Sequence, residues 1–383
     1  MSAAISLGAC HNISDLRELA RRRLPSPIFH YLDGGAEDEG TLFRNTAAFD
    51  DDRLIPKCLV DVTQVKTSTR ILGQVLDWPV FCSPAGAARF LHPEGELAVA
   101  RAVAKSGTLY SLSTMSTHSL EAVAAQSRLK MFQLYIFKDR GVTRELIERC
   151  KQAGFQALCL TVDTPVPGKR ERDLRMGWGI PIRLSLSSVV SFGMRPAWCF
   201  GQAMKGPLSI PNVESQIGKS GIVAQTKFVG SQLDPSVSWK DVGEFIRLWG
   251  GPFAIKGIMA ADDARRAADV GATAVIVSNH GGRQLDGAAA TFEALPAIAE
   301  AVGNRLDVIL DGGVRRGVHV LKALARGAKA CSIGRPYLYG LAAGGEAGVT
   351  KALDILRSEL VRTMQLSGCT DVAKAGDGFV RRF

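Results

Sequence analysis

The chain has 383 residues, 46% of them hydrophobic and 22% charged, an ordinary globular mixture that excludes collagen, coiled coils and extensive disorder. Lysine and arginine total 47 against 37 aspartates and glutamates, which gives a formal net charge of +10. This balance favours anionic partners, but it does not choose between an acidic substrate, a phosphate, a lipid surface and nucleic acid.

The predicted elements begin with a helical lead-in over residues 1–77, in which residues 13–24 form a short amphipathic helix. From residue 78 to 366, short apolar runs alternate with longer helical patterns. Eight strands are predicted, at residues 79–83, 109–113, 131–135, 157–162, 253–256, 274–277, 308–310 and 330–333. Because helices alternate with these strands, we expect an α/β fold, a (β/α)8 TIM barrel, with a doubly wound open sheet as the alternative. No GxGxxG sequence follows the first strand, which argues against a dinucleotide fold.

One connection interrupts this alternation, because residues 164–238 separate the fourth strand from a helix that begins at Trp239. Ordinary βα loops have about 2–6 residues. A long insertion at the C-terminal face of a barrel lies beside the active site, so we expect a lid or a partner-docking segment. Residues 367–383 are expected to form a mobile basic tail, and residues 1–383 a single domain.

The insertion is strongly basic. Between residues 174 and 230 it has one acid, Glu214, and six cations: Arg175, Arg183, Arg195, Lys205, Lys219 and Lys227. Apolar side chains lie among them: Leu184, Leu186, Val189, Val190, Phe192, Met194, Trp198 and Phe200. Basic and apolar residues together suit an interfacial membrane segment. A loop that packs on its own protein or at a subunit interface is the alternative.

The eight cysteines include no CxxC pair, so we expect neither a zinc site nor a redox dithiol, and no metal. A secreted disulfide framework is not expected in so large a chain, and no signal peptide or bilayer-spanning apolar run is evident. A cytoplasmic location follows, or a peripheral one on the cytoplasmic face of the inner membrane. Aromatic residues are only 7%, and no basic stripe with stacking aromatics is present, so no nucleic-acid role is expected.

In a barrel enzyme, polar residues at the C-terminal ends of strands are typical of catalysis. The first strand ends in small residues, Ser83 to Ala87, which let a flat ligand lie against the backbone. The next three strands end in hydroxyl, amide, phenol and carboxyl groups: Ser113, Gln133, Tyr135, Thr161 and Asp163. The fifth strand ends in Lys256, which is costly to bury unless it is paired with negative charge.

The last three strands complete the predicted site. The sixth is followed by SNHGGRQLD at residues 278–286, where His280 could act as a general base and Arg283 could bind a carboxylate. Glycine-rich loops that carry arginine follow the seventh and eighth strands, beginning at Asp311 and Gly334. Such loops form the usual phosphate site of barrel enzymes. A phosphorylated cofactor such as FMN is therefore expected.

These sequences resemble the FMN-dependent α-hydroxy-acid dehydrogenases and oxidases, a family that includes glycolate oxidase, lactate oxidase, mandelate dehydrogenase and bacterial L-lactate dehydrogenase. The resemblance is carried by FHYLDGGAED at residues 29–38, QLY at 133–135, TVD at 161–163, SNHGGRQLD at 278–286 and DGGVRR at 311–316. It extends over residues 16–368 and is greatest to the bacterial quinone-dependent L-lactate dehydrogenases.

The resemblance implies specific roles toward a substrate. His280 would be the base that accepts a proton as the substrate is oxidised, and Asp163 would orient the imidazole and stabilise its charged form. Tyr135 would hydrogen-bond the substrate hydroxyl or steady the transition state. Three residues would bind the substrate carboxylate: Tyr31, Arg170 and Arg283.

The resemblance also implies how FMN is held. Lys256 would stabilise the negative charge of the reduced flavin. The flavin ring would be held by the backbone of Ala85 and Gly86 and by the side chains of Ser113, Gln133, Thr161 and Ser278. The ribityl chain would contact Asp311, and the phosphate would be bound by Gly313, Arg315, Gly334 and Arg335.

The function implied is oxidation of an L-2-hydroxy acid, first of all L-lactate to pyruvate, with electrons passed to a quinone or another carrier and a homotetramer as the assembly. The alternatives are an oxidase that uses oxygen and releases peroxide, a dehydrogenase for an aromatic or longer acid such as mandelate, and an FMN-binding barrel without redox turnover. Met115 stands where the plant oxidases have tryptophan, which weakens the case for glycolate. Gly86 stands where oxidases commonly have alanine, which hints at a dehydrogenase.

Overall fold

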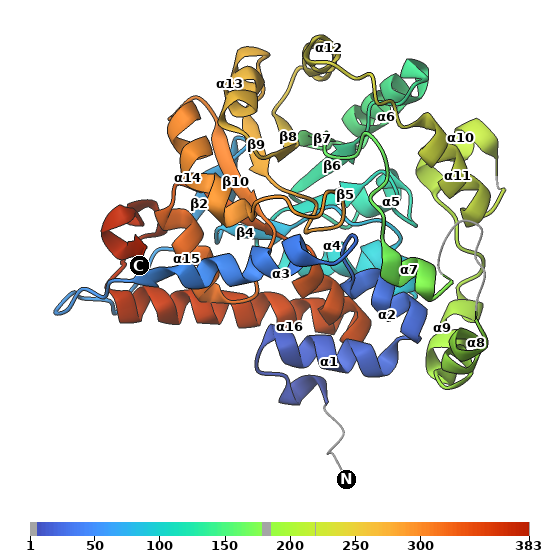
Figure 1. Ribbon diagram of the computed structural model, residues 1–383, viewed down its shortest axis with the longest axis horizontal. Helices are drawn as coiled ribbons and strands as arrows, with labels where there is room; N and C mark the ends of the chain where they lie inside the picture. The colour runs from blue at the N-terminus through green and yellow to red at the C-terminus, as the bar shows by residue number, and fades with distance from the viewer. Residues whose placement is uncertain (1–5, 178–184, 219, 383) are drawn as a thin grey trace.

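The computed structural model describes residues 6–177, 185–218 and 220–382. Eight parallel strands form a closed barrel in the order β10-β11-β4-β5-β6-β7-β8-β9, surrounded by helices (Figure 1). Their bounds are β4 Val80–Cys82, β5 Tyr110–Ser113, β6 Lys130–Leu134, β7 Ala157–Thr161, β8 Phe253–Ile258, β9 Ala274–Val277, β10 Asp307–Asp311 and β11 Ala330–Ile333. The TIM barrel prediction is confirmed, and each predicted strand overlaps one of these eight.

The helices after the barrel strands are α4 Gly95–Lys105, α5 Leu120–Ala124, α6 Arg140–Gln152, α12 Trp239–Trp249, α13 Ala261–Asp269, α14 Thr291–Val302, α15 Gly317–Ala325 and α16 Arg335–Ser367. Helix α12 begins at Trp239 as predicted, because Ser238 and Asp241 form a capping box there. Strands β5, β7, β9 and β11 are buried at every residue, as expected when helices cover a parallel sheet. Helix α16 is interrupted by non-helical backbone at Gly344 and Gly345.

The lead-in is more than helical. It has helices α1 Ile13–Arg23, α2 Ser26–Asp33 and α3 Gly40–Ala47, but also strands β1 Asp52–Leu54, β2 Thr69–Ile71 and β3 Gln74–Leu76. The β2–β3 hairpin turns through Leu72 and Gly73, both at positive φ. Its Ile71, Leu72 and Leu76 pack with the inward-facing residues of the barrel strands. The hairpin therefore covers an apolar end of the barrel that water would otherwise reach.

The prediction of a mobile C-terminal tail is wrong for the described residues. Strand β12, Val380–Arg382, pairs antiparallel with β1, so that Asp52 lies opposite Arg382. The side chains of Phe379 and Val380 are buried, whereas Arg381 and Arg382 remain exposed. The two arginines made the segment resemble a solvated tail, but its apolar residues and its backbone hydrogen bonds fix it to the lead-in.

The insertion contains helices α7 Glu171–Arg175, α8 Leu186–Gly193, α9 Pro196–Met204, α10 Glu214–Ile217 and α11 Ile222–Gln232. Helices α8 and α9 lie at the edge of the molecule, away from the barrel strands (Figure 1). Among the described helices, none is long and apolar enough to span a bilayer. Arg183, Leu184 and Lys219, which belong to the predicted basic and apolar set, lie outside the described residues.

Candidate active site

A cavity of about 430 Å³ lies at the C-terminal ends of the barrel strands. It is bounded by the predicted site residues Tyr31, Ala85, Gly86, Ser113, Gln133, Tyr135, Thr161, Arg170, Lys256, His280, Arg283, Asp311, Gly313, Arg315, Gly334 and Arg335. The other two predicted residues, Asp163 and Ser278, make hydrogen bonds to residues of this wall. The structure therefore gathers the whole predicted set around one cavity.

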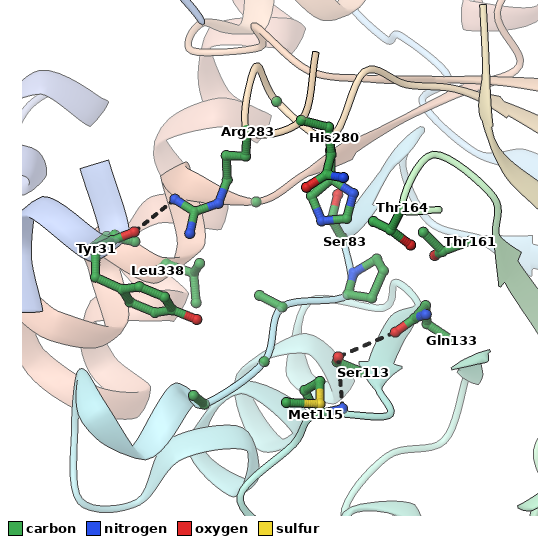
Figure 2. Close-up of a pocket in the computed structure, with 18 of the residues that line it drawn as sticks. Tyr31, Ser83, Ser113, Met115, Gln133, Thr161, Thr164, His280, Arg283 and Leu338 are labelled. Atoms are coloured by element: carbon green, nitrogen blue, oxygen red, sulfur yellow. Dashed lines mark hydrogen bonds between the residues drawn. The ribbon is translucent and has the colours of Figure 1, made fainter. Parts of the chain in front are cut away.

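His280 and Asp163 form a hydrogen-bonded pair, with Nδ1 of the imidazole 2.9 Å from Oδ1 of the carboxylate. The imidazole extends into the cavity (Figure 2). His280 has a φ of +57°, a left-handed conformation that non-glycine residues rarely adopt. Asn279 and Asn45 of α3 exchange two amide hydrogen bonds of 2.8 Å, which fix this turn to the lead-in. The side chain of His280 is thus placed by its neighbours rather than by local preference.

Lys256 is buried between two carboxylates. Its Nζ lies 4.0 Å from Asp163 Oδ2 and 3.5 Å from Asp311 Oδ2, and it donates to Ser278 Oγ at 3.0 Å. Burial alone would lower the pKa of Lys256, but the two carboxylates outweigh burial and raise it. Burial would likewise raise the pKa of Asp163, but His280 and Lys256 lower it. Around Lys256, one cation is therefore held between two anions.

Asp311 accepts three hydroxyl hydrogen bonds, from Ser83 and Ser332 at 2.5 Å and from Ser278 at 2.7 Å. Ser83 was expected only as one of the small residues beside a flat ligand, and Ser332 was not expected in the site. The available signal was a hydroxyl near the end of an otherwise apolar strand, as in Ala330–Ile333. Ser278 was expected to hold the cofactor; its hydroxyl bonds Asp311 and Lys256, so it also orders the two charged groups.

Two arginines flank Tyr31, the α2 residue at one side of the cavity. The guanidinium carbon of Arg283 lies 5.2 Å from the centre of the Tyr31 ring, and that of Arg170 lies 5.6 Å from it. Arg283 donates to the carbonyl oxygens of Tyr31 and Gly34 at 2.7 and 3.0 Å, the first of which Figure 2 shows. Burial and the neighbouring Arg170 lower the pKa of Arg283 to about 10. Arg170 lies 3.5 Å from the buried Asp173 carboxylate, whereas Arg283 has no ion-pair partner among the described residues. The two guanidinium groups therefore keep a net positive charge that suits an anion.

Two more guanidinium groups, those of Arg315 and Arg335 in the loops after β10 and β11, border the cavity. Arg335 donates to the carbonyl oxygens of Gly281 and Gly34 at 2.9 and 2.8 Å, and its buried Nε has no hydrogen-bond partner among the described residues. Burial lowers the pKa of Arg335 to about 10 and also lowers that of Arg315. A Cβ added at Gly334 would meet no atom within 4 Å, so open space lies beside the start of α16. Cations, a free N–H and a helix N-terminus fit a phosphate group.

Polar side chains and close backbone line another part of the cavity wall. Met115 donates its backbone N–H to Ser113 Oγ at 3.1 Å, and that hydroxyl lies 3.3 Å from Gln133 Oε1 (Figure 2). A Cβ added at Gly86 would come within 2.7 Å of the Met115 Cβ. A flat heteroaromatic ring with hydrogen-bonding edges fits such a wall. The residues present therefore suit FMN along the whole cavity.

Comparison with known proteins identifies the fold's relatives. Residues 20–382 match the family described as FMN-dependent dehydrogenase. The chain belongs to the FMN-dependent dehydrogenase family. Its cofactor is FMN, and its activity is the FMN-dependent oxidation of a 2-hydroxy acid. The predictions of family, cofactor and reaction class are confirmed.

Relatives within the FMN-dependent dehydrogenase family differ in their named substrates and acceptors. The chain is 44% identical to an L-lactate oxidase of Nostoc sp., over 96% of this chain and 97% of the relative. It is 43% identical to an L-lactate dehydrogenase of Caulobacter vibrioides, over 95% and 96%. Among solved structures, the monotopic membrane protein (S)-mandelate dehydrogenase matches with a TM-score of 0.94 and 36% identity, over 98% of this chain and all of that one.

Proposed function

We propose that this enzyme oxidises L-lactate to pyruvate and passes the electrons to a quinone, as a homotetramer. The observation that supports the substrate class most directly is the His280–Asp163 pair beside the guanidinium groups of Arg170 and Arg283. A hydroxy acid needs both functions, since its carboxylate requires a cationic partner and its hydroxyl a proton acceptor.

In this proposal each side chain has a defined role. Arg283, Arg170 and Tyr31 bind the substrate carboxylate, which places the hydroxyl toward His280 and Tyr135. His280 accepts a proton, and Asp163 stabilises the imidazolium that forms. Burial raises the pKa of Tyr135 to about 12, so its phenol stays protonated and can donate a hydrogen bond to the substrate oxygen.

FMN, when bound, takes the two electrons that leave the substrate carbon. Lys256 keeps its proton between two carboxylates and offers positive charge to the reduced ring. Ser113, Gln133, Thr161 and the backbone of Ala85 and Gly86 would hold the ring, and Ser278 would order Lys256 and Asp311 beside it. Asp311 would contact the ribityl chain, and Gly313, Arg315, Gly334 and Arg335 would bind the phosphate.

We further propose that α8 and α9 dock on the cytoplasmic face of the inner membrane, where a quinone is available. Large apolar side chains are exposed there: Leu186, Val189, Val190, Met194, Phe200 and Met204. Arg175, Arg195 and Lys205 flank them. Basic residues beside exposed apolar ones suit an anionic lipid surface. The name of the structural relative, a monotopic membrane protein, supports the same proposal.

An oxidase acting on L-lactate and a dehydrogenase acting on an aromatic acid are the two alternatives. The first is supported by the identity to an L-lactate oxidase. The second is supported by an apolar wall in the cavity, formed by Met115 together with Ile210, Val229 and Leu233 from the insertion. Such a wall suits a substrate side chain larger than methyl.

Anaerobic titration of the FMN-loaded enzyme tests the proposal. L-lactate should bleach the flavin absorbance faster than L-mandelate or glycolate, and a quinone should then restore it faster than air. Faster bleaching by L-mandelate would shift the substrate to aromatic acids, and rapid reoxidation by air with peroxide release would make the enzyme an oxidase. Flavin that no 2-hydroxy acid bleaches would contradict the proposed substrate class.

A further inference from the structure

A buried carboxylate outside the cavity joins three parts of the chain. Asp33, the last residue of α2, is 6% exposed. Arg17 of α1 donates to both of its oxygens, at 2.6 and 2.7 Å. Tyr339 of α16 donates at 2.7 Å, and Arg172 of α7 at 3.1 Å. Burial alone would raise the pKa of Asp33, but the hydrogen bonds from Arg17 and Tyr339 help lower it to about 2, so it is ionised.

Arg172 also pairs with a second buried carboxylate, that of Glu39. Glu39 accepts the backbone N–H of Gly35 at 2.8 Å, so Arg172 spans the turn that follows α2. The Gly34 carbonyl in this turn accepts hydrogen bonds from Arg283 and Arg335. The ion pairs join two cations, Arg17 and Arg172, to two anions, Asp33 and Glu39, so their charges balance.

The position of Arg172 in the chain connects this network to the substrate site. Arg172 is two residues after Arg170, at the start of the insertion, and Asp33 is two residues after Tyr31. The backbone N–H of Glu37 donates to the Lys169 carbonyl at 2.8 Å, which adds a contact between the same two segments. The ion pairs of Arg172 therefore hold the segment that carries Arg170 against the helix that carries Tyr31.

We propose that Arg172 is a positioning residue for the substrate carboxylate. Its ion pairs with Asp33 and Glu39 keep the Arg170 guanidinium over the Tyr31 ring, where the carboxylate binds. The inference rests on the proposed role of Arg170. Arg17 provides a matched comparison, because it binds the same Asp33 carboxylate from α1 and makes no ion pair with the insertion among the described residues.

The test compares R172M with R17M as FMN-loaded enzymes. Oxalate, a dicarboxylate that carries no oxidisable hydroxyl, is titrated while the flavin absorbance is followed, and KM and kcat are measured with the acid that reduces the flavin fastest. R172M should raise the oxalate Kd and the KM about tenfold, with kcat within about threefold, because a displaced Arg170 costs binding more than chemistry. R17M should lower Tm and leave the oxalate Kd within about twofold.

E39Q adds a milder variant, in case R172M does not fold or bind FMN. Glutamine keeps the acceptor for the Gly35 N–H but removes one charge from Arg172, so the oxalate Kd should rise several-fold. Equal effects of R17M and R172M on this Kd would mean that the network only stabilises the fold and that Arg172 has no specific positioning role. An unchanged Kd in folded R172M and E39Q would overturn the inference. Wild-type enzyme that binds oxalate but is reduced by no hydroxy acid would refute the proposed function alone, since the Kd comparison does not need turnover.

Discussion

At the scale of single residues, the site is organised around buried charges that compensate one another. A lysine at the end of an apolar strand predicts a nearby negative charge, and the structure supplies two, Asp163 and Asp311. Asp163 faces Lys256 with one oxygen and pairs with the His280 imidazole through the other. A proton arriving on His280 would therefore balance a charge that is already in place, which favours His280 as the proton acceptor.

The H280Q variant tests this role. Glutamine can still hydrogen-bond Asp163 but cannot accept the proton, so the rate of anaerobic flavin reduction by the substrate should fall by about 10²–10⁴-fold. Stopped-flow absorbance measures this rate. His118 offers a control, because its Nδ1 lies at the same 2.9 Å from a buried carboxylate, Glu96, outside the cavity wall. The flavin of H118Q should be reduced at a rate within a few-fold of the wild-type rate. An H280Q enzyme that binds FMN and keeps most of this rate would contradict the assignment.

At the scale of elements, the insertion has an inner and an outer side. Trp198 of α9 donates to the Phe90 carbonyl at 2.9 Å, and Arg89 donates to the Lys205 and Gly206 carbonyls at 2.9 and 3.0 Å. These bonds fix α9 to the loop after β4, close to Gly86. Leu186, Val189, Val190 and Met194, with Phe200 and Met204 of α9, remain exposed on the outer side.

Vesicle binding tests the outer side of these helices. The double variant L186S/F200S should bind vesicles containing phosphatidylglycerol at least about tenfold more weakly than wild type, because two exposed apolar side chains are lost from the interface. Co-sedimentation measures the binding, and added salt should weaken it for wild type. L285S/L366S removes apolar residues of similar exposure elsewhere and should bind as wild type does. Equal binding by both double variants would place the membrane contact elsewhere.

Strands and site residues were predictable to different degrees. Short apolar runs that alternate with helical patterns sufficed to predict the eight barrel strands, and the sequence around His280 and Arg283 sufficed to place these residues at the cavity. Three-residue strands such as β1 and β12 show no usable periodicity, and their pairing joins distant parts of the chain. The ion pair between Arg172 and Asp33 could not be predicted from the sequence for the same reason, because only the fold brings α7 to α2.

At the scale of the whole molecule, the cavity concentrates positive charge. The guanidinium groups of Arg170, Arg283, Arg315 and Arg335 all border it, and Arg283 and Arg335 donate to the same Gly34 carbonyl. Guanidinium groups cannot shed their protons near neutral pH, so without an anion they repel one another inside the protein. Ligands that supply negative charge should therefore stabilise the entire fold, in addition to occupying the cavity.

Removal and replacement of the cofactor test this expectation. The apoenzyme should unfold several degrees below the FMN-loaded enzyme, since a ligand at about 100 times its Kd adds about 2.7 kcal/mol of stability. Differential scanning calorimetry gives the two values of Tm. Riboflavin has the ring but no phosphate for Arg315 and Arg335. It should therefore raise the Tm of the apoenzyme much less than FMN does at the same concentration. Equal recovery with riboflavin would contradict the phosphate site.

The pairing of β1 with β12 has a consequence for how the protein is made. A ribosome releases β1 early, but its partner strand follows only after all eight barrel strands have been synthesised. Helix α1 likewise cannot pack until α16, its packing partner, has been synthesised. During translation the lead-in therefore cannot complete its packing, and the edge of β1 stays unpaired while the barrel strands are synthesised. We expect nascent chains stalled before residue 380 to need a chaperone more than completed ones do.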